Sequence, residues 1–193
     1  ITASTAKRVG LGAAGTLFLL DAKSGEILKE TPTNWSVAEP ILTSDCIVTF
    51  GARKGVIQCH DRGLREIVWQ TELGSGSRVW SNPLFSKKHN MIYLVTSDTG
   101  TIIDENRSND RYSSSLIGIN AKTGTVIFSR QMIKTGVWDF DGVGKPILVE
   151  NFTTDDGKIH DLIVGLNKTG TVFVLNAVDG TPIKNDQFKE VLF

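Results

Sequence analysis

The chain has 193 residues, enough for one or two domains, and its 21 basic and 21 acidic side chains give a net charge of about zero. This balance argues against a nucleic-acid-binding surface, which needs a basic face. No apolar run approaches the roughly 20 residues of a membrane-spanning helix, so we expect no transmembrane segment. The first residues show no signal-peptide pattern, and any targeting segment is expected to be missing or already removed.

A short pattern occurs four times and predicts pairs of short strands joined by tight turns. Each copy has an apolar, β-branched run followed by Asp or Asn at the seventh position, and three copies have Gly four residues later. The copies begin at Gly15, Gly55, Ser114 and Gly170. Nineteen glycines and almost no helical periodicity also favour strands. Self-similarity at this scale is typical of a β-propeller, in which each repeat forms one four-stranded blade.

Taken in order, the chain divides into repeats at about residues 1–31, 35–73, 78–131 and 137–184. We therefore expect an all-β fold, a single domain over 1–193 that forms a partial propeller of about three and a half blades. Trp69 falls on the last strand of the second repeat, where a large ring would pack between neighbouring blades. Polar insertions are expected at 98–111 and 151–160, and residues 185–193 have no clear assignment.

The number of repeats has a physical consequence, because propellers usually close with about four to eight blades. An open arc would expose the apolar flank of each terminal sheet and a bare strand edge. We therefore expect the chain to be a segment of a longer protein whose remaining blades close the ring. The alternative is that a second copy covers the open flanks in a symmetric dimer.

The two cysteines, Cys46 and Cys59, allow two interpretations. If Ala52 and Arg53 form a two-residue hairpin loop, the register places Cys46 opposite Cys59, and a cross-strand disulfide is conceivable. The interpretation that we prefer from the sequence is two unpaired, buried, small apolar residues, because the register is itself an inference.

The repeats resemble those of the pyrroloquinoline quinone (PQQ) quinoprotein family, and several separate segments resemble its alcohol and glucose dehydrogenases in order and spacing. The similarity covers most of residues 10–183. Its clearest segments are Val79-Trp80-Ser81-Asn82-Pro83, Tyr112-Ser113-Ser114-Ser115-Leu116, Asn120-Ala121-Lys122-Thr123-Gly124, Val137-Trp138-Asp139-Phe140-Asp141 and Lys168-Thr169-Gly170. The resemblance implies about half of an eight-bladed propeller.

The resemblance also implies PQQ and calcium as cofactors and assigns site residues. Trp80 matches the family's tryptophan that stacks on PQQ, and Lys168 matches a cation that contacts the quinone oxygens. Asp98 matches a calcium-ligating asparagine, and an aspartate is also a hard oxygen ligand. Asp110 lies near the catalytic base, with Asn109 competing for that position. The structural alternatives are a core tryptophan, an exposed turn lysine and turn or loop aspartates.

One departure from the family pattern bears on metal binding. The stretch from Leu11 to Gly15 resembles a family segment that begins with a calcium-ligating Glu, and that place is held by Gly10. Losing a carboxylate removes both a charge and an oxygen from a calcium shell.

Two functional hypotheses follow from these features. The first is a segment of a periplasmic PQQ- and calcium-dependent dehydrogenase that oxidises an alcohol or sugar hydroxyl and passes electrons to an acceptor. We expect the segment alone to be inactive. The second is a non-catalytic propeller scaffold that binds protein partners in the envelope, similar to the outer-membrane assembly lipoproteins built from the same repeat. In that case the two polar insertions would be loops that face a partner.

Overall fold

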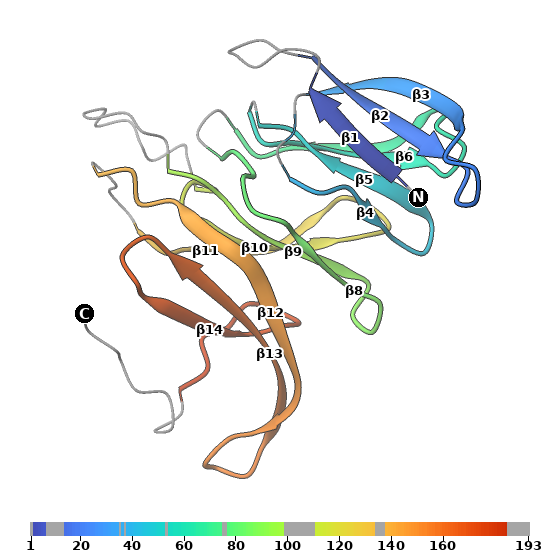
Figure 1. Cartoon of the computed structure of the whole chain (residues 1–193). Coiled ribbons are helices and arrows are strands. Elements are labelled where there is room, and N and C mark those ends of the chain that lie inside the picture. Colours follow the sequence, from blue (N-terminus) through green and yellow to red (C-terminus); the bar gives the residue numbers. More distant parts are fainter. Residues whose placement is uncertain are drawn as a thin grey trace.

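The structure is a computed structural model that describes residues 2–6, 14–34, 36, 38–52, 54–74, 77–98, 111–133 and 138–184. Within these residues the fold is all-β, and the strands form four antiparallel sheets that succeed one another along the chain (Figure 1). The described part of the chain contains no helix with the length and apolar character that a membrane crossing requires.

Each sheet is a meander in which consecutive strands pair. The first contains β1 (Thr2–Ala6), β2 (Ala14–Leu20) and β3 (Ile27–Asn34). The second contains β4 (Ile41–Leu42), β5 (Cys46–Phe50), β6 (Val56–Asp61) and β7 (Ile67–Glu72). The third contains β8 (Leu84–Ser86), β9 (Met91–Val95), β10 (Ser115–Asn120) and β11 (Val126–Gln131). The fourth contains β12 (Gly142–Thr153), β13 (Ile159–Asn167) and β14 (Val172–Asn176).

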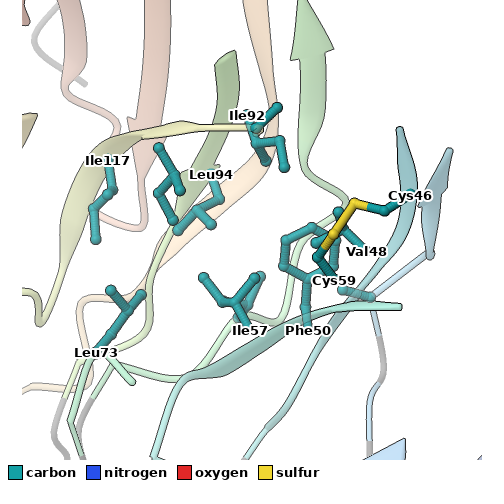
Figure 2. Packing of buried hydrophobic residues seen from close by; sticks show 13 residues of the cluster. Cys46, Val48, Phe50, Ile57, Cys59, Leu73, Ile92, Leu94 and Ile117 are labelled. Atoms are coloured by element: carbon teal, nitrogen blue, oxygen red, sulfur yellow. A yellow bond between two sulfur atoms is a disulfide. The ribbon is translucent and has the colours of Figure 1, made fainter. Parts of the chain in front are cut away.

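The core lies between successive sheets. One cluster joins the second sheet, including Phe50 and Ile57, to the third, including Leu94 and Ile117 (Figure 2). Another joins the third sheet to the fourth. A strand with a sheet on each side must be apolar on both faces, and all five residues of β5 and all five of β9 are accordingly buried. Sheets stacked face to face in succession are the blades that the repeats predicted.

Neighbouring blades also meet through a ring packed against a glycine. Trp69, the third residue of β7, packs so closely on the turn after β10 that a β-carbon built on Gly124 would lie 2.5 Å from Trp69 Cε3. Phe128, the third residue of β11, packs in the same way on Gly180, where a built β-carbon would lie 2.4 Å from Phe128 Cδ2. The expected packing of Trp69 between blades is therefore confirmed, and Phe128 takes the equivalent place in the next blade.

Side chains of one blade donate hydrogen bonds to main-chain carbonyls of the next. Trp69 Nε1 donates to Ala121 O at 3.2 Å, and Thr71 Oγ1 donates to Gly124 O at 2.6 Å. One blade further on, Tyr93 Oη donates to Ala177 O at 2.8 Å, and Arg130 Nε donates to Gly180 O at 2.7 Å. The hydrogen bonds at these two interfaces thus end on corresponding carbonyls, because residues 121 and 177 occupy the same place in their repeats, as do 124 and 180.

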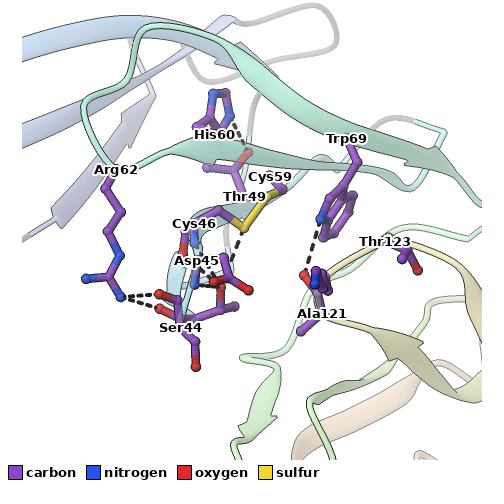
Figure 3. Close-up of a disulfide and its surroundings, with 12 residues drawn as sticks. Ser44, Asp45, Cys46, Thr49, Cys59, His60, Arg62, Trp69, Ala121 and Thr123 are labelled. Carbon is purple, nitrogen blue, oxygen red and sulfur yellow. Dashed lines mark hydrogen bonds between the residues drawn. A yellow bond between two sulfur atoms is a disulfide. The ribbon is translucent and has the colours of Figure 1, made fainter.

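The preferred expectation for the cysteines was wrong, because Cys46 and Cys59 form a disulfide with Cα atoms 5.7 Å apart (Figure 3). The assumed register was also wrong by two residues, since Cys46 pairs with Asp61 and Val48 pairs with Cys59. The reason is that the β5–β6 connection is longer than a two-residue loop, with Gly51 N donating to Val56 O. The disulfide therefore joins diagonal neighbours on one face of the sheet.

Half of the second predicted insertion, 151–160, is strand rather than loop. β12 continues to Thr153 and β13 begins at Ile159, so the segment extends a hairpin with a short turn at its tip. Most of the first insertion and the tail at 185–193 lie outside the described residues.

Candidate functional site

Three chain segments meet at one end of the third and fourth sheets. They are the residues that follow β9, those that precede β12 and those that follow β13. Gly142 N donates to Thr96 O at 2.9 Å, which fixes the start of β12 beside the end of β9. Because β12 and β13 are antiparallel, the end of β13 returns to the same place. The polar residues at these strand ends are thereby brought together.

Lys168 is held between two carboxylates at this end. Its Nζ lies 2.8 Å from Asp139 Oδ2 and 2.5 Å from Asp141 Oδ2. The hydrogen bonds that Lys168 Nζ donates to these two carboxylates, first Asp139 and then Asp141, raise the pKa of Lys168 above its ordinary value. Asp141 also accepts a hydrogen bond through Oδ1 from Asp98 N at 2.7 Å. Asp141 therefore links Lys168 to the segment that carries Asp98, whose side chain is buried.

Hydrogen bonds fix the backbone around these carboxylates. Lys168 N donates to Asp141 O at 3.0 Å, and Ser114 Oγ donates to Phe140 O at 2.6 Å. Ser114 and Asp139 both have left-handed backbone angles, with φ of 43° and 60°. Side-chain-bearing residues adopt this region at an energetic cost, and such residues concentrate at functional sites.

Trp80 lies at the same end, on the segment between the second and third sheets. Its ring is 37% exposed, and the Arg78 guanidinium carbon lies 5.8 Å from the ring centroid. Arg78 N donates to Ser97 Oγ at 3.1 Å and Ser97 N donates to Arg78 O at 2.8 Å, so this segment runs beside the residue that precedes Asp98. A partly exposed indole near cationic groups suits a flat, anionic ligand.

The structure therefore places three of the four predicted site residues, Trp80, Asp98 and Lys168, at one end of the blades. Asp110, the predicted base, and its competitor Asn109 lie outside the described residues, and so does Gly10. The roles of all four stay predictions.

Two residues of this site, Asp139 and Asp141, received no role from the sequence. The signal was present, because both belong to the Trp138-Asp139-Phe140-Asp141 segment that resembles the dehydrogenases. An Asp-x-Asp pair directly before a strand places carboxylates at a strand end, where a lysine at the end of the partner strand can reach them. Only the pairing of β12 with β13 identifies that lysine as Lys168.

The residues present fit a calcium ion in their chemistry. The buried Asp98 and the Asp139–Asp141 pair offer hard carboxylate oxygens, the donor type that calcium prefers. They also fit a flat quinone that carries carboxylates, since Trp80 offers a ring face and Arg78 and Lys168 offer positive charge.

Comparison with known proteins identifies the family of this chain. Residues 55–191 match the PQQ family model, described as the glucose/ethanol/alcohol dehydrogenase beta-propeller domain. The chain belongs to this family. Among curated proteins, the PQQ family member "Quinoprotein glucose dehydrogenase" of Escherichia coli (strain K12) is 27% identical over 169 residues, which cover 73% of this chain and 21% of that protein. "Methanol dehydrogenase [cytochrome c] subunit 1" of Methylorubrum extorquens is 24% identical over 186 residues, covering 94% of this chain and 28% of that protein.

Solved structures show the same propeller fold. A europium-containing methanol dehydrogenase superposes with a TM-score of 0.76 at 20% identity, covering 88% of this chain and 38% of that one. BamB from Moraxella catarrhalis gives a TM-score of 0.55 at 19% identity, with 88% and 44% covered. The chain thus spans roughly a fifth to a quarter of these two curated relatives and forms a partial propeller of PQQ-type blades.

Proposed function

We propose that this chain is the segment of a PQQ- and calcium-dependent dehydrogenase that carries part of its cofactor site, and that the enzyme oxidises an alcohol or sugar hydroxyl. The observation that carries the proposal is the cluster in which Asp139 and Asp141 hold Lys168 beside Asp98. Family membership supplies the reaction class, because relatives in this family are named as glucose, methanol and alcohol dehydrogenases.

In this proposal each described residue has a distinct task. When bound, PQQ supplies a quinone that accepts a hydride from the substrate carbon. Trp80 gives the ring a flat surface to lie on, and Lys168 holds a fixed positive charge where negative charge develops. Asp98 and Asp141 would supply oxygen ligands for calcium, and the hydrogen bond from Asp98 N to Asp141 Oδ1 fixes the spacing of their segments.

The proton of the substrate hydroxyl needs a carboxylate as acceptor. Asp110 stays our predicted base from the sequence, and Asp139 is a second candidate. The Asp139 side chain is 68% exposed while one of its oxygens contacts Lys168, so its other oxygen is accessible to a substrate. A base must lie within hydrogen-bond reach of the proton that it removes.

The disulfide supports a location outside the cytoplasm. Disulfides persist in oxidising compartments such as the bacterial periplasm and are rare in reducing ones. Together with the family, the Cys46–Cys59 disulfide favours a periplasmic enzyme that passes its electrons to a separate acceptor.

The second candidate function is a non-catalytic scaffold that binds protein partners. It is favoured by Gly10, which stands where the family pattern expects a calcium-ligating Glu, and by the fold shared with BamB. The two functions differ in a measurable property, since only the dehydrogenase needs PQQ and calcium.

The test is PQQ uptake by the natural protein that contains this chain, in the presence of calcium and followed by the absorbance of the cofactor and by dye reduction with alcohols and sugars. Lys168→Met should weaken PQQ binding by about 10–100-fold, the equivalent of one hydrogen bond to a charged group. Lys158→Met is the matched control, because Lys158 is also paired with an aspartate, Asp156, but lies on the turn at the tip of the β12–β13 hairpin.

The outcomes separate the two functions. Uptake that is lost with Lys168→Met and kept with Lys158→Met supports the dehydrogenase. Absence of uptake at saturating PQQ and calcium would favour the scaffold. Asp139→Asn and Asp110→Asn then distinguish the two candidate bases, since only the true base should lower kcat without weakening PQQ binding.

A further inference from the structure

A second cluster of ligand-type side chains lies at the opposite end of the same two blades. It consists of His89, Glu150 and Asp161, each of which offers one ligand atom, and these atoms all lie within 4.8 Å of one another. His89 belongs to the turn between β8 and β9, whereas Glu150 and Asp161 belong to β12 and β13. The cluster therefore joins the third sheet to the fourth.

Its distance from the site described above follows from the strands. Asp161 is near the start of β13 and Lys168 directly follows its end, so about 23 Å of extended chain separates them. Strand β9 separates the two sites in the same way, because His89 precedes its first residue and Asp98 follows its last. In Figure 1 the β8–β9 turn and the tip of the β12–β13 hairpin both lie toward the lower part of the view.

His89 has an unusual environment within this cluster. Its side chain is 12% exposed, and its Nε2 lies 2.7 Å from Asp161 Oδ2. Nε2 is buried, so this contact with the carboxylate is shielded from solvent. This buried ring nitrogen and carboxylate oxygen, together with a carboxylate oxygen of Glu150, form a group of three donor atoms close enough to be shared by one divalent ion.

Asp161 is prepared to act as an anionic ligand. Its side chain is only 8% exposed, and Asn151 N donates to its Oδ1 at 2.8 Å, which orients the carboxylate and leaves Oδ2 toward His89. A hydrogen bond to the far oxygen is the usual support of a ligating carboxylate.

We propose that His89, Glu150 and Asp161 form a divalent-metal site, with zinc as the preferred ion, that ties the third blade to the fourth. One imidazole and two carboxylates suit zinc, and the exposed Glu150 leaves room for a water molecule as a fourth ligand. Ions that prefer all-oxygen sites, such as magnesium, bind an imidazole less well.

Lys88 regulates this site by occupying it. Its Nζ lies 2.6 Å from Asp161 Oδ2, the same oxygen that faces His89. The ammonium group and a metal ion cannot both use that oxygen, so the metal must displace Lys88. The Lys88 side chain is 48% exposed and can swing into solvent, which makes the displacement feasible.

The test is titration of the purified natural protein that contains this chain with zinc chloride, followed by calorimetry and by the thermal unfolding midpoint, with magnesium in parallel. We expect about one zinc ion per chain and a rise in the midpoint, because an ion that binds only the folded state stabilises it. Cobalt in place of zinc should give visible absorption bands that report the nitrogen ligand.

Three variants make the test specific. Changes to residues that merely support a ligand cost about 10–100-fold in metal affinity, so His89→Gln, which removes a ligand, should cost at least as much. His160→Gln is the matched control, a neighbouring histidine outside the cluster, and should bind zinc like the wild type. Lys88→Met should bind zinc several-fold more tightly.

Each result has a definite meaning. Zinc binding that His89→Gln abolishes and His160→Gln preserves supports the site, and a near-ultraviolet spectrum confirms that His89→Gln is folded. The proposal is overturned if the wild type binds no zinc, if His89→Gln binds it equally well, or if cobalt shows no nitrogen-ligand bands. Weaker binding by Lys88→Met would overturn the competition. None of these outcomes depends on PQQ or on dehydrogenase activity.

Discussion

Gly124 and Gly25 occupy the same place in their repeats and have the same φ of 74°, yet their surroundings differ. A β-carbon on Gly124 would meet the Trp69 ring, whereas a β-carbon on Gly25 would meet no described atom within 4 Å. Gly25 therefore shows the requirement for a positive φ alone, whereas Gly124 combines that requirement with the need to leave space for the Trp69 ring.

Replacing each glycine with alanine should give different losses of stability. Both variants bear the cost of a side chain at positive φ, about 1–2 kcal/mol. Gly124→Ala should lose a further ~1–3 kcal/mol, because its methyl group pushes against Trp69. Urea unfolding of the two variants measures the difference, and equal losses would show that Trp69 moves aside without cost.

His60 gives the stability of the chain a dependence on pH. The ring is buried, with Nε2 3.2 Å from Thr49 Oγ1, and burial lowers its pKa, an effect that Asp61 partly opposes. The unfolded chain therefore binds a proton more readily than the folded chain just below the ordinary pKa of about 6.5. The stabilisation from neutral His60 is complete above that value and is lost as the pH falls through the lower pKa of the folded state.

The free energy of unfolding, measured between about pH 7.5 and 5, should accordingly fall more steeply for the wild type than for His60→Gln, which carries no titrating ring. A variant that follows the wild-type curve would assign the pH dependence to other groups.

At the scale of elements, the disulfide fastens β5 to β6 inside the best-buried part of the fold. Both cysteines are 1% exposed and belong to the core shared by the second and third sheets (Figure 2). Thr43 Oγ1 donates to Cys46 O at 3.1 Å, so the turn before β5 is tied to the same point. The link closes a short loop, with a sequence separation of 13.

Removing this link should lower the free energy of unfolding by about 2–4 kcal/mol, mainly because the unfolded chain regains freedom. Urea unfolding of Cys46→Ala/Cys59→Ala, with and without a reductant, measures the loss. The reductant should destabilise the wild type and leave the double variant unchanged. An equal response of both proteins would mean that the disulfide does not form in solution.

The sequence could indicate that a disulfide was conceivable but could not establish it. Strand register depends on the length of the connecting loop, and the loop after Phe50 proved longer than the sequence suggested. A shift of two residues keeps every side chain on its own face, so the apolar pattern of β5 and β6 agrees equally well with both registers.

At the scale of the whole molecule, the order of blades and the all-β class were predictable because they repeat. Each repeat offers an independent copy of the same strand and turn signals, and these copies support one another. The interblade place of Trp69 was predictable for the same reason. The extended hairpin of β12 and β13 was not, because polar residues on long exposed strands are typical of loops as well.

The site was predictable only where a residue has a counterpart in the family. Trp80, Asp98 and Lys168 were assigned in this way; the structure brings them to one end of the blades, and their roles stay predictions. The contact of Lys168 with Asp139 and Asp141 depends on β12 pairing with β13, a non-local feature. The cluster around His89 likewise combines a turn with two later strands and has no sequence signature.

Four of the hydrogen bonds between blades end on main-chain oxygens, namely those of Ala121, Gly124, Ala177 and Gly180. Every amino acid carries a main-chain oxygen, so these hydrogen bonds do not themselves dictate a side chain, whereas the packing of Trp69 and Phe128 requires glycine at 124 and 180. Such a joint tolerates evolutionary drift and gene duplication, since a copied blade already has the means to attach to the blade beside it. Bonding through main-chain oxygens helps repeats that share only a few residues to assemble in the same way.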